Sequence, residues 1–127
     1  MKGFFVVLAV ASLYACGGSG GSTTSPMNQG VNTPPPSGAI SVTNDMFSPG
    51  TKTVAVGTTV KWAWNSCSGD AYNGQTCGSH SVTFDDGTAS SPLQDQGTFD
   101  KTFSAAGTFT YHCQIHGASM TGTITVQ

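Results

Sequence analysis

The amino-acid sequence predicts an all-β sandwich that forms a single small domain. Two observations carry this prediction: apolar residues alternate with polar ones in short runs, and glycine, proline, asparagine and aspartate separate the runs. Such alternation is typical of strands that bury one face. No apolar stripe with helical spacing is long enough to indicate a helix, and residues 39–127 leave no room for a second hydrophobic core.

The alternating runs give the expected strands in chain order. Their inward-facing side chains are expected to be Ile40 and Val42; Val54 and Val56; Val60, Trp62 and Trp64; His80, Val82 and Phe84; Phe109, Tyr111 and Cys113; and Ile124 and Val126. Side chains two residues apart on a strand share a face, so His80 and Cys113 are predicted to point into the sandwich. The same rule predicts that His112 points away from the face of Cys113. Gly57 and Gly107 interrupt the runs, as turn residues do.

The segment before this domain predicts export and attachment to a membrane. Residues 1–15 contain one lysine, an apolar run and then small residues, which is the layout of a secretory signal and too short to span a bilayer. The sequence Leu13-Tyr14-Ala15-Cys16 resembles a bacterial lipoprotein signal, and this resemblance makes Cys16 the lipid anchor. Residues 16–38 are rich in Gly, Ser, Thr and Pro and are expected to be an unfolded tether.

The expected location is therefore outside the cytoplasm. The domain is lipid-anchored to a bacterial membrane and faces the periplasm if Cys16 is acylated, and it is periplasmic or secreted if Cys16 is an odd free thiol. The expected membrane contact is the anchor alone. Gly17 is compatible with sorting to the outer membrane but does not decide between the two membranes.

The charge of the chain excludes nucleic acid as a partner. The formal net charge is -2, only 8% of residues are charged, and there is no arginine. The lysines of the domain, Lys52, Lys61 and Lys101, are too few to steer a charged partner and are expected to be ordinary solvated residues. A monomer is expected.

Three cysteines of the domain remain to be explained in an oxidising compartment. Cys67 and Cys77 lie in a polar, glycine-rich insertion between Trp64 and His80, and a disulfide between them would brace a surface loop that has no core of its own. Closing a loop of about ten residues contributes on the order of 2 to 3 kcal/mol in the chain-entropy model. This pairing leaves the thiol of Cys113 for another role.

The free thiol lies in a segment rich in metal ligands. Cys113, His116 and Met120 follow an apolar run within eight residues, and His80 is predicted to face the same interior. Two imidazoles, one thiolate and one weak thioether are the ligands of a blue-copper centre. Thiolate and thioether suit Cu(I), and imidazole suits both oxidation states of copper.

Two other interpretations compete with copper. Cys77 and His80, with Cys113 and His116, have the Cys-x-x-His spacing of a tetrahedral zinc site, although this leaves Cys67 unpaired and Met120 without a role. Alternatively, each residue is purely structural, because cysteine and methionine often fill cores and histidine is common on surfaces. That explanation suits each residue alone better than all of them together.

At these residues the chain resembles the cupredoxin family, in particular plastocyanin-like and related small bacterial blue copper proteins. The matching residues are Ser79-His80-Ser81-Val82; Tyr111, Cys113, His116, Met120 and Gly122; Phe47-Ser48-Pro49; and Val54-Ala55-Val56-Gly57. The resemblance covers nearly all of residues 39–127. It implies a cupredoxin-like Greek-key β-sandwich with one type 1 copper per chain.

The chain departs from the plastocyanin pattern around the ligands. Ser81 stands where plastocyanins have an asparagine that braces the cysteine loop, so any brace depends here on a shorter hydroxyl. Ile115 stands where they have proline. Three residues, not four, separate His116 from Met120, so neither the copper–sulfur distance nor the reduction potential transfers from the family.

The resemblance implies a single-electron shuttle that cycles copper between Cu(II) and Cu(I), and not an enzyme. The thiolate of Cys113 would supply the strong bond, His80 and His116 would complete the plane, and Met120 would tune the potential. The expected partners are redox proteins such as cytochromes or copper oxidoreductases. They would meet the chain at His116, within a rim of small and apolar residues formed by Phe47, Pro49, Gly117 and Ala118.

Two other functions use the same residues differently. A copper storage or delivery protein would need an open site that exchanges its ion easily. A small oxidase or reductase would need a further metal or an open coordination position, and no second cluster of ligands appears in the sequence.

Overall fold

The computed structural model describes residues 34–70 and 72–127, and every regular element among them is a strand. The strands are β1 (Ile40–Thr43), β2 (Met46–Ser48), β3 (Thr51–Val54), β4 (Thr59–Trp64), β5 (Cys67–Asp70), β6 (Gly74–Cys77), β7 (Thr83–Phe84), β8 (Thr98–Thr102), β9 (Gly107–Cys113) and β10 (Gly117–Val126). Within these described ranges, no helix could cross a membrane. The predicted all-β class is confirmed.

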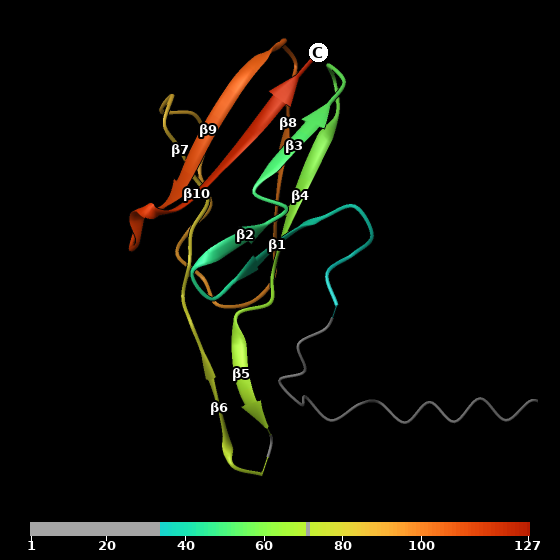
Figure 1. Ribbon diagram of the computed structural model, residues 1–127. Helices are drawn as coiled ribbons and strands as arrows, with labels where there is room; N and C mark the ends of the chain where they lie inside the picture. The colour runs from blue at the N-terminus through green and yellow to red at the C-terminus, as the bar shows by residue number, and fades with distance from the viewer. Residues whose placement is uncertain (1–33, 71) are drawn as a thin grey trace, which may run out of the picture.

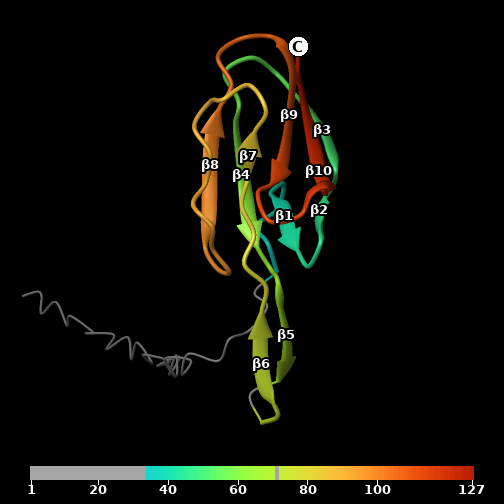
Figure 2. The same ribbon diagram turned by 90° about the vertical axis from the view of Figure 1, so that its left-hand side faces the viewer.

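Two four-stranded sheets form the sandwich (Figures 1 and 2). Their strand orders are β2-β1-β4-β8 and β3-β10-β9-β7. The chain passes from the first sheet to the second between β2 and β3, where Pro49 and Gly50 interrupt the ladder. As a result, β1 pairs with β4 in parallel and β10 pairs with β3 in parallel, whereas the other pairs within both sheets are antiparallel.

Aromatic rings fill the space between the sheets. Trp62 and Tyr111 are fully buried, and their ring centroids lie 5.5 Å apart in an edge-to-face contact. Tyr111 also meets the ring of Phe47 at 4.8 Å. Large aromatic side chains contribute most of the apolar area that such a small core can bury. The buried hydrophobic cluster comprises Ile40, Val42, Phe47, Val60, Trp62, Trp64, Val82, Phe84, Phe103, Tyr111, Cys113, Met120, Ile124 and Val126.

Most of the residues predicted to face inward do so, but Val56 does not. It is 49% exposed, because β3 ends at Val54 and the chain then turns at Gly57. Gly57 has a φ of 87°, a left-handed conformation that favours glycine. The alternating sequence pattern therefore extends two residues beyond the end of the strand, and this is why the prediction for Val56 was wrong.

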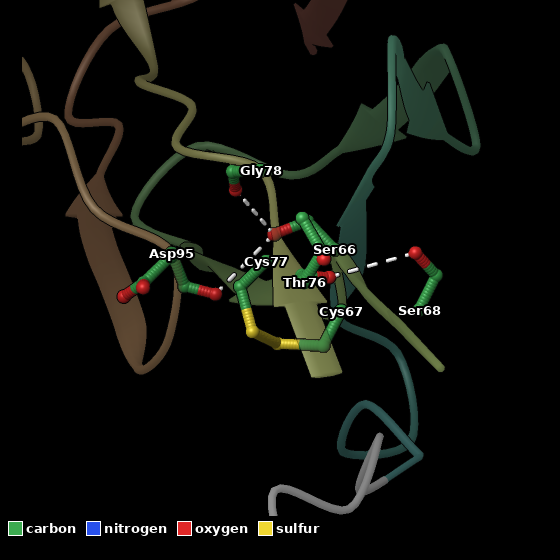
Figure 3. Close-up of a disulfide and its surroundings, with 7 residues drawn as sticks. All are labelled: Ser66, Cys67, Ser68, Thr76, Cys77, Gly78 and Asp95. Atoms are coloured by element: carbon green, nitrogen blue, oxygen red, sulfur yellow. Dashed lines mark hydrogen bonds between the residues drawn. A yellow bond between two sulfur atoms is a disulfide. The ribbon is translucent and has the colours of Figure 1, made fainter. Parts of the chain in front are cut away.

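The insertion between Trp64 and the second half of the domain is a hairpin, not a loop. Strands β5 and β6 extend from the sandwich at the end opposite the C-terminus (Figure 1). Cys67 pairs directly with Cys77 in the ladder, and their disulfide has an S–S distance of 2.08 Å (Figure 3). The two strands of this hairpin are polar. The sequence therefore lacked the apolar alternation that marks a half-buried strand, and the hairpin was not predicted.

Hydrogen bonds tie both ends of this hairpin. At its base, the Ser66 hydroxyl donates to the carbonyl of Gly78 at 2.6 Å (Figure 3). At its tip, the carboxylate of Asp70 accepts from the backbone amides of Tyr72 and Asn73, at 2.9 and 2.7 Å. The hydrogen bonds from Asn73, its side chain first, lower the pKa of Asp70.

The end of the predicted tether has some local structure. The amide of Ala39 donates to the carbonyl of Pro36 at 2.9 Å, and Lys52 donates to the carbonyl of Gly38. The signal at residues 1–15, the anchor Cys16 and the tether up to residue 33 lie outside the described residues.

Candidate metal centre

Three of the predicted ligands meet at one end of the sandwich. Ligand atoms of His80, Cys113 and His116 all lie within 4.8 Å of one another, and they form the one such group of His, Cys or acidic residues in the described part of the chain. The Sγ of Cys113 lies 3.8 Å from Nδ1 of His80. The two imidazole centroids are 5.0 Å apart.

The loop between β9 and β10 brings its ligands back over the strand that precedes it. Cys113 ends β9, and the amide of His116 donates to the Cys113 carbonyl at 3.2 Å. The amide of Ser119 donates in turn to the His116 carbonyl at 3.1 Å, and Gly117 adopts a φ of 52°. Met120 follows on β10, 1% exposed and in the same buried cluster as Cys113.

His80 is held differently from the prediction. It was expected within a strand that continues to Phe84, but β7 contains only Thr83 and Phe84, and His80 makes an isolated bridge with Gln94. The two residues exchange backbone hydrogen bonds of 2.8 and 3.0 Å. The predicted inward direction is correct, because His80 is 2% exposed.

The ring nitrogens of the two histidines show where a metal would bind. Nδ1 of His116 is buried without a hydrogen-bond partner, and Nδ1 of His80 faces the cysteine sulfur. An unpaired buried polar atom costs about 1–3 kcal/mol, so a bound ion would relieve this cost. Two imidazole nitrogens, the buried sulfur of Cys113 and the thioether of Met120, which belongs to the same buried cluster, match the donor preferences of copper.

Burial also favours the neutral, metal-binding form of His80. Desolvation lowers its pKa, the neighbouring His116 lowers it further, and Asp45 partly opposes the shift. The folded, metal-free protein therefore takes up a proton at this ring less readily than the unfolded chain does.

This shift predicts a pH-dependent stability for the metal-free protein. The unfolded chain binds the His80 proton below about pH 6.5 and the folded protein binds it less readily, so the free energy of unfolding should fall as the pH falls through that value. Denaturant unfolding between about pH 8 and pH 5 measures this loss and avoids most carboxylate titration. A His80→Asn variant should show a smaller loss, and equal slopes for both proteins would contradict the prediction.

Ser81 braces the cysteine loop. Its hydroxyl accepts a hydrogen bond from the backbone amide of Gln114 at 2.9 Å, and the side chain is fully buried. It also lies 3.0 Å from the hydroxyl of Thr83. The shorter side chain at this position therefore ties the segment of the first histidine to the residue that follows Cys113.

His112 lies outside the group, as the strand phase predicted. Its Nδ1 lies 2.6 Å from a carboxylate oxygen of Asp85, at the surface. The pKa of Asp85 is lowered by hydrogen bonds, first from Thr110 and then from His112. The imidazole next to Cys113 thus has a surface partner and does not belong to the candidate metal site.

The zinc interpretation is wrong. Cys77 is bonded to Cys67, so it has no thiolate to offer a tetrahedral site. Cys113 is the free cysteine among the described residues.

The prediction that Phe47 belongs to the docking rim is also wrong. Phe47 is only 4% exposed and packs against Tyr111, whereas Pro49 and Ala118 are exposed and Gly117 is half-buried. In β2 the side chain of Phe47 points inward, so the side chains of its neighbours Met46 and Ser48 point outward.

Two exposed apolar side chains near His116 were missed. Ile115 directly precedes His116 in the sequence. Met46 directly follows Asp45, whose carboxylate contacts His116. The side chains of Ile115 and Met46 are each 56% exposed. Met46 and Phe47 are both apolar, so the sequence contained no alternating pattern that would have marked Met46 as the exposed residue of β2.

Comparisons with known proteins agree with this geometry. A sequence model described as copper binding proteins, plastocyanin/azurin family, matches residues 39–127. Similar solved structures include an oxidized mutant of amicyanin (27% identity, 75% of this chain and 88% of that chain, TM-score 0.56). They also include oxidized plastocyanin from Dryopteris crassirhizoma (24%, 68% and 99%, TM-score 0.53) and a purple cupredoxin from Nitrosopumilus maritimus (24%, 65% and 82%, TM-score 0.52). The two structures at 24% identity support the fold alone.

Proposed function

Because the chain belongs to the plastocyanin/azurin family of copper-binding proteins, we propose that it shuttles single electrons between redox partner proteins. His80, Cys113, His116 and Met120 are arranged as a type 1 copper site, and the protein is a blue copper protein. Copper, when bound, supplies the Cu(II)/Cu(I) couple. The protein's own contribution is to hold the ligands in one arrangement for both oxidation states.

The closed site is the observation that carries this proposal. His80, Cys113 and Met120 are 2%, 0% and 1% exposed, and the hydrogen bond from Gln114 to Ser81 ties the two ligand segments together. A closed, braced site suits a centre that exchanges electrons but retains its metal. A storage or delivery protein would favour ligands that solvent and acceptors can reach.

His116 is the proposed point of electron entry and exit. Its side chain is 30% exposed. The exposed apolar residues Ile115 and Ala118 lie close to His116 in the sequence, and exposed Met46 follows Asp45, which contacts His116. A weakly charged apolar surface suits brief encounters with redox proteins such as cytochromes or copper oxidoreductases. The protein would act as a monomeric carrier and not as an enzyme.

We further propose an extracytoplasmic location. The motif that ends at Cys16 supports a lipid anchor on a bacterial membrane, with the copper domain facing the periplasm on a tether up to residue 38. Without acylation, the same signal supports a periplasmic or secreted protein.

Electron exchange and copper loss test the shuttle against copper handling. In mixtures of the Cu(I) and Cu(II) protein, NMR line broadening should reveal rapid electron self-exchange, because little rearrangement accompanies electron transfer. Copper should move only slowly to an added chelator, because three ligands are buried. Slow self-exchange with rapid copper loss would instead identify a storage or delivery protein.

A further inference from the structure

The turn between β1 and β2 places a carboxylate against the outer nitrogen of His116. An oxygen of Asp45 lies 3.1 Å from Nε2 of this imidazole. The opposite nitrogen, Nδ1, is buried and has no hydrogen-bond partner. The two nitrogens of the ring are therefore in different environments, one paired with an anion and one directed away from solvent.

The backbone of the turn holds Asp45 in this position. Thr43 and Met46 pair across the antiparallel β1–β2 ladder, and the Thr43 hydroxyl donates to the Met46 carbonyl at 3.2 Å. Asp45 itself has a φ of 63°, which aspartate tolerates better than most residues. The turn belongs to one sheet and His116 follows a strand of the other, so the contact joins the two sheets at the metal site.

The same turn also lies close to the second histidine. A Cβ atom on Gly78 would lie 2.9 Å both from Oδ1 of Asn44 and from Nε2 of His80. Gly78 therefore lies between the side chain of Asn44 in the β1–β2 turn and the ring of His80, and a larger side chain at position 78 would displace one of them.

We propose that Asp45 is a positioning residue for the copper ligand His116. Its carboxylate accepts the Nε2–H of the neutral imidazole, which places the ring proton on Nε2 and leaves the lone pair on Nδ1 free for the metal. A hydrogen bond at the far nitrogen commonly decides which nitrogen of a histidine binds a metal.

The negative charge of Asp45 has a second effect, which rests on the proposed electron-transfer function. An anion next to a ligand stabilises Cu(II) more than Cu(I), because the oxidised ion carries one more positive charge. Asp45 should therefore lower the reduction potential. An ordinary surface pair, which its 77% exposed side chain would otherwise suggest, would change neither the tautomer nor the potential.

Two variants of Asp45 separate these effects, with Asp100→Asn as a charge-matched control on the edge strand β8. Asp45→Gly removes the side chain and tolerates the positive φ. Asp45→Asn keeps an acceptor oxygen and removes the charge. Circular dichroism verifies that each variant is folded before the comparison.

The first measurement uses nitrogen-15 NMR of the copper-free protein at about pH 8, where free imidazoles are neutral. The native protein and Asp45→Asn should hold His116 as the Nε2–H tautomer, whereas Asp45→Gly should show a mixture. The same tautomer distribution in the native protein and Asp45→Gly, or an Nδ1–H tautomer in the native protein, would overturn the proposal.

The second measurement is the reduction potential of the copper-loaded proteins. Both Asp45 variants should raise the Cu(I)/Cu(II) ratio at a fixed applied potential by about threefold to tenfold, or about 30 to 60 mV, and Asp100→Asn should change it less. Equal shifts in all three variants would overturn the charge effect. If the copper-loaded native protein shows no blue copper signal, the proposed function is refuted. The NMR experiment on the copper-free protein would still decide the role of Asp45.

Discussion

A Cys113→Ser variant should bind Cu(II) without the intense blue absorption and the narrow copper hyperfine splitting of the native protein. Both signals arise from a covalent copper–thiolate bond, and a serine hydroxyl is a hard, neutral oxygen donor that does not replace it. Cys113 is fully buried at the end of β9 and near both imidazoles, so its sulfur is the available thiolate in the described part of the chain. Visible absorption and electron paramagnetic resonance spectra of the two proteins, recorded side by side, measure the loss.

His112→Gln is the matched control for this experiment. His112 is adjacent to Cys113 but contacts Asp85 on the other face of β9, so its replacement should keep the blue spectrum. A pale Cu(II) spectrum in the native protein that does not depend on Cys113 would contradict the type 1 assignment. So would an equal loss of the blue band in the control.

A Gly122→Ala variant should be destabilised by about 3 kcal/mol or more, at the upper end of the usual cost of overpacking. Gly122 lies opposite Tyr111 in the β9–β10 ladder, and the tyrosine ring covers it. A Cβ atom on Gly122 would lie 2.2 Å from Cζ of that ring. Tyr111 is fully buried and packed between other rings, so it has no room to move aside.

Denaturant unfolding of the copper-free protein measures this loss. Gly50→Ala is the control, because a Cβ atom there would meet only the Phe47 carbonyl oxygen at 3.7 Å, an ordinary contact. We expect Gly50→Ala to change the free energy of unfolding by less than about 1 kcal/mol. Similar stabilities for Gly122→Ala and the native protein would show that the tyrosine ring can relocate.

The burial of Tyr111 also has a chemical consequence. Desolvation raises the pKa of its phenol to about 12, so the side chain stays neutral beside the copper loop across the physiological range.

The contact between Tyr111 and Gly122 physically links the Tyr-x-Cys and Met-x-Gly segments of the sequence. The tyrosine of one strand needs the glycine of its partner strand.

Strand alternation predicted the site well where a side chain is buried on a single face. The inward direction of Cys113 and the outward direction of His112 follow from the two-residue period of β9. The predicted inward direction of His80 is also correct, but His80 lies outside a strand and its neighbour Ser81 is buried as well. Alternation failed where pairing stops or where both faces are polar. Val56 lies past the end of β3, and the polar β5–β6 hairpin contains no apolar run from which to predict a strand.

The docking surface illustrates a different limit. Phe47 was assigned to the docking rim through the family resemblance, but it is buried in the core, and its neighbour Met46 is exposed instead. Asp45 was not singled out at all. Nothing in a local sequence shows that a turn near residue 45 meets a loop near residue 116, because that contact depends on how the two sheets pack.

The sequence by itself determined the all-β class, the copper-type donor set and the inward direction of Cys113, because these depend on local period and on the chemistry of each side chain. Only the tertiary structure decided that His80 and the Cys113 loop lie within 4.8 Å, that Ser81 reaches Gln114, and that Asp45 faces His116. These contacts join segments more than thirty residues apart, and sheet pairing and core packing bring them together.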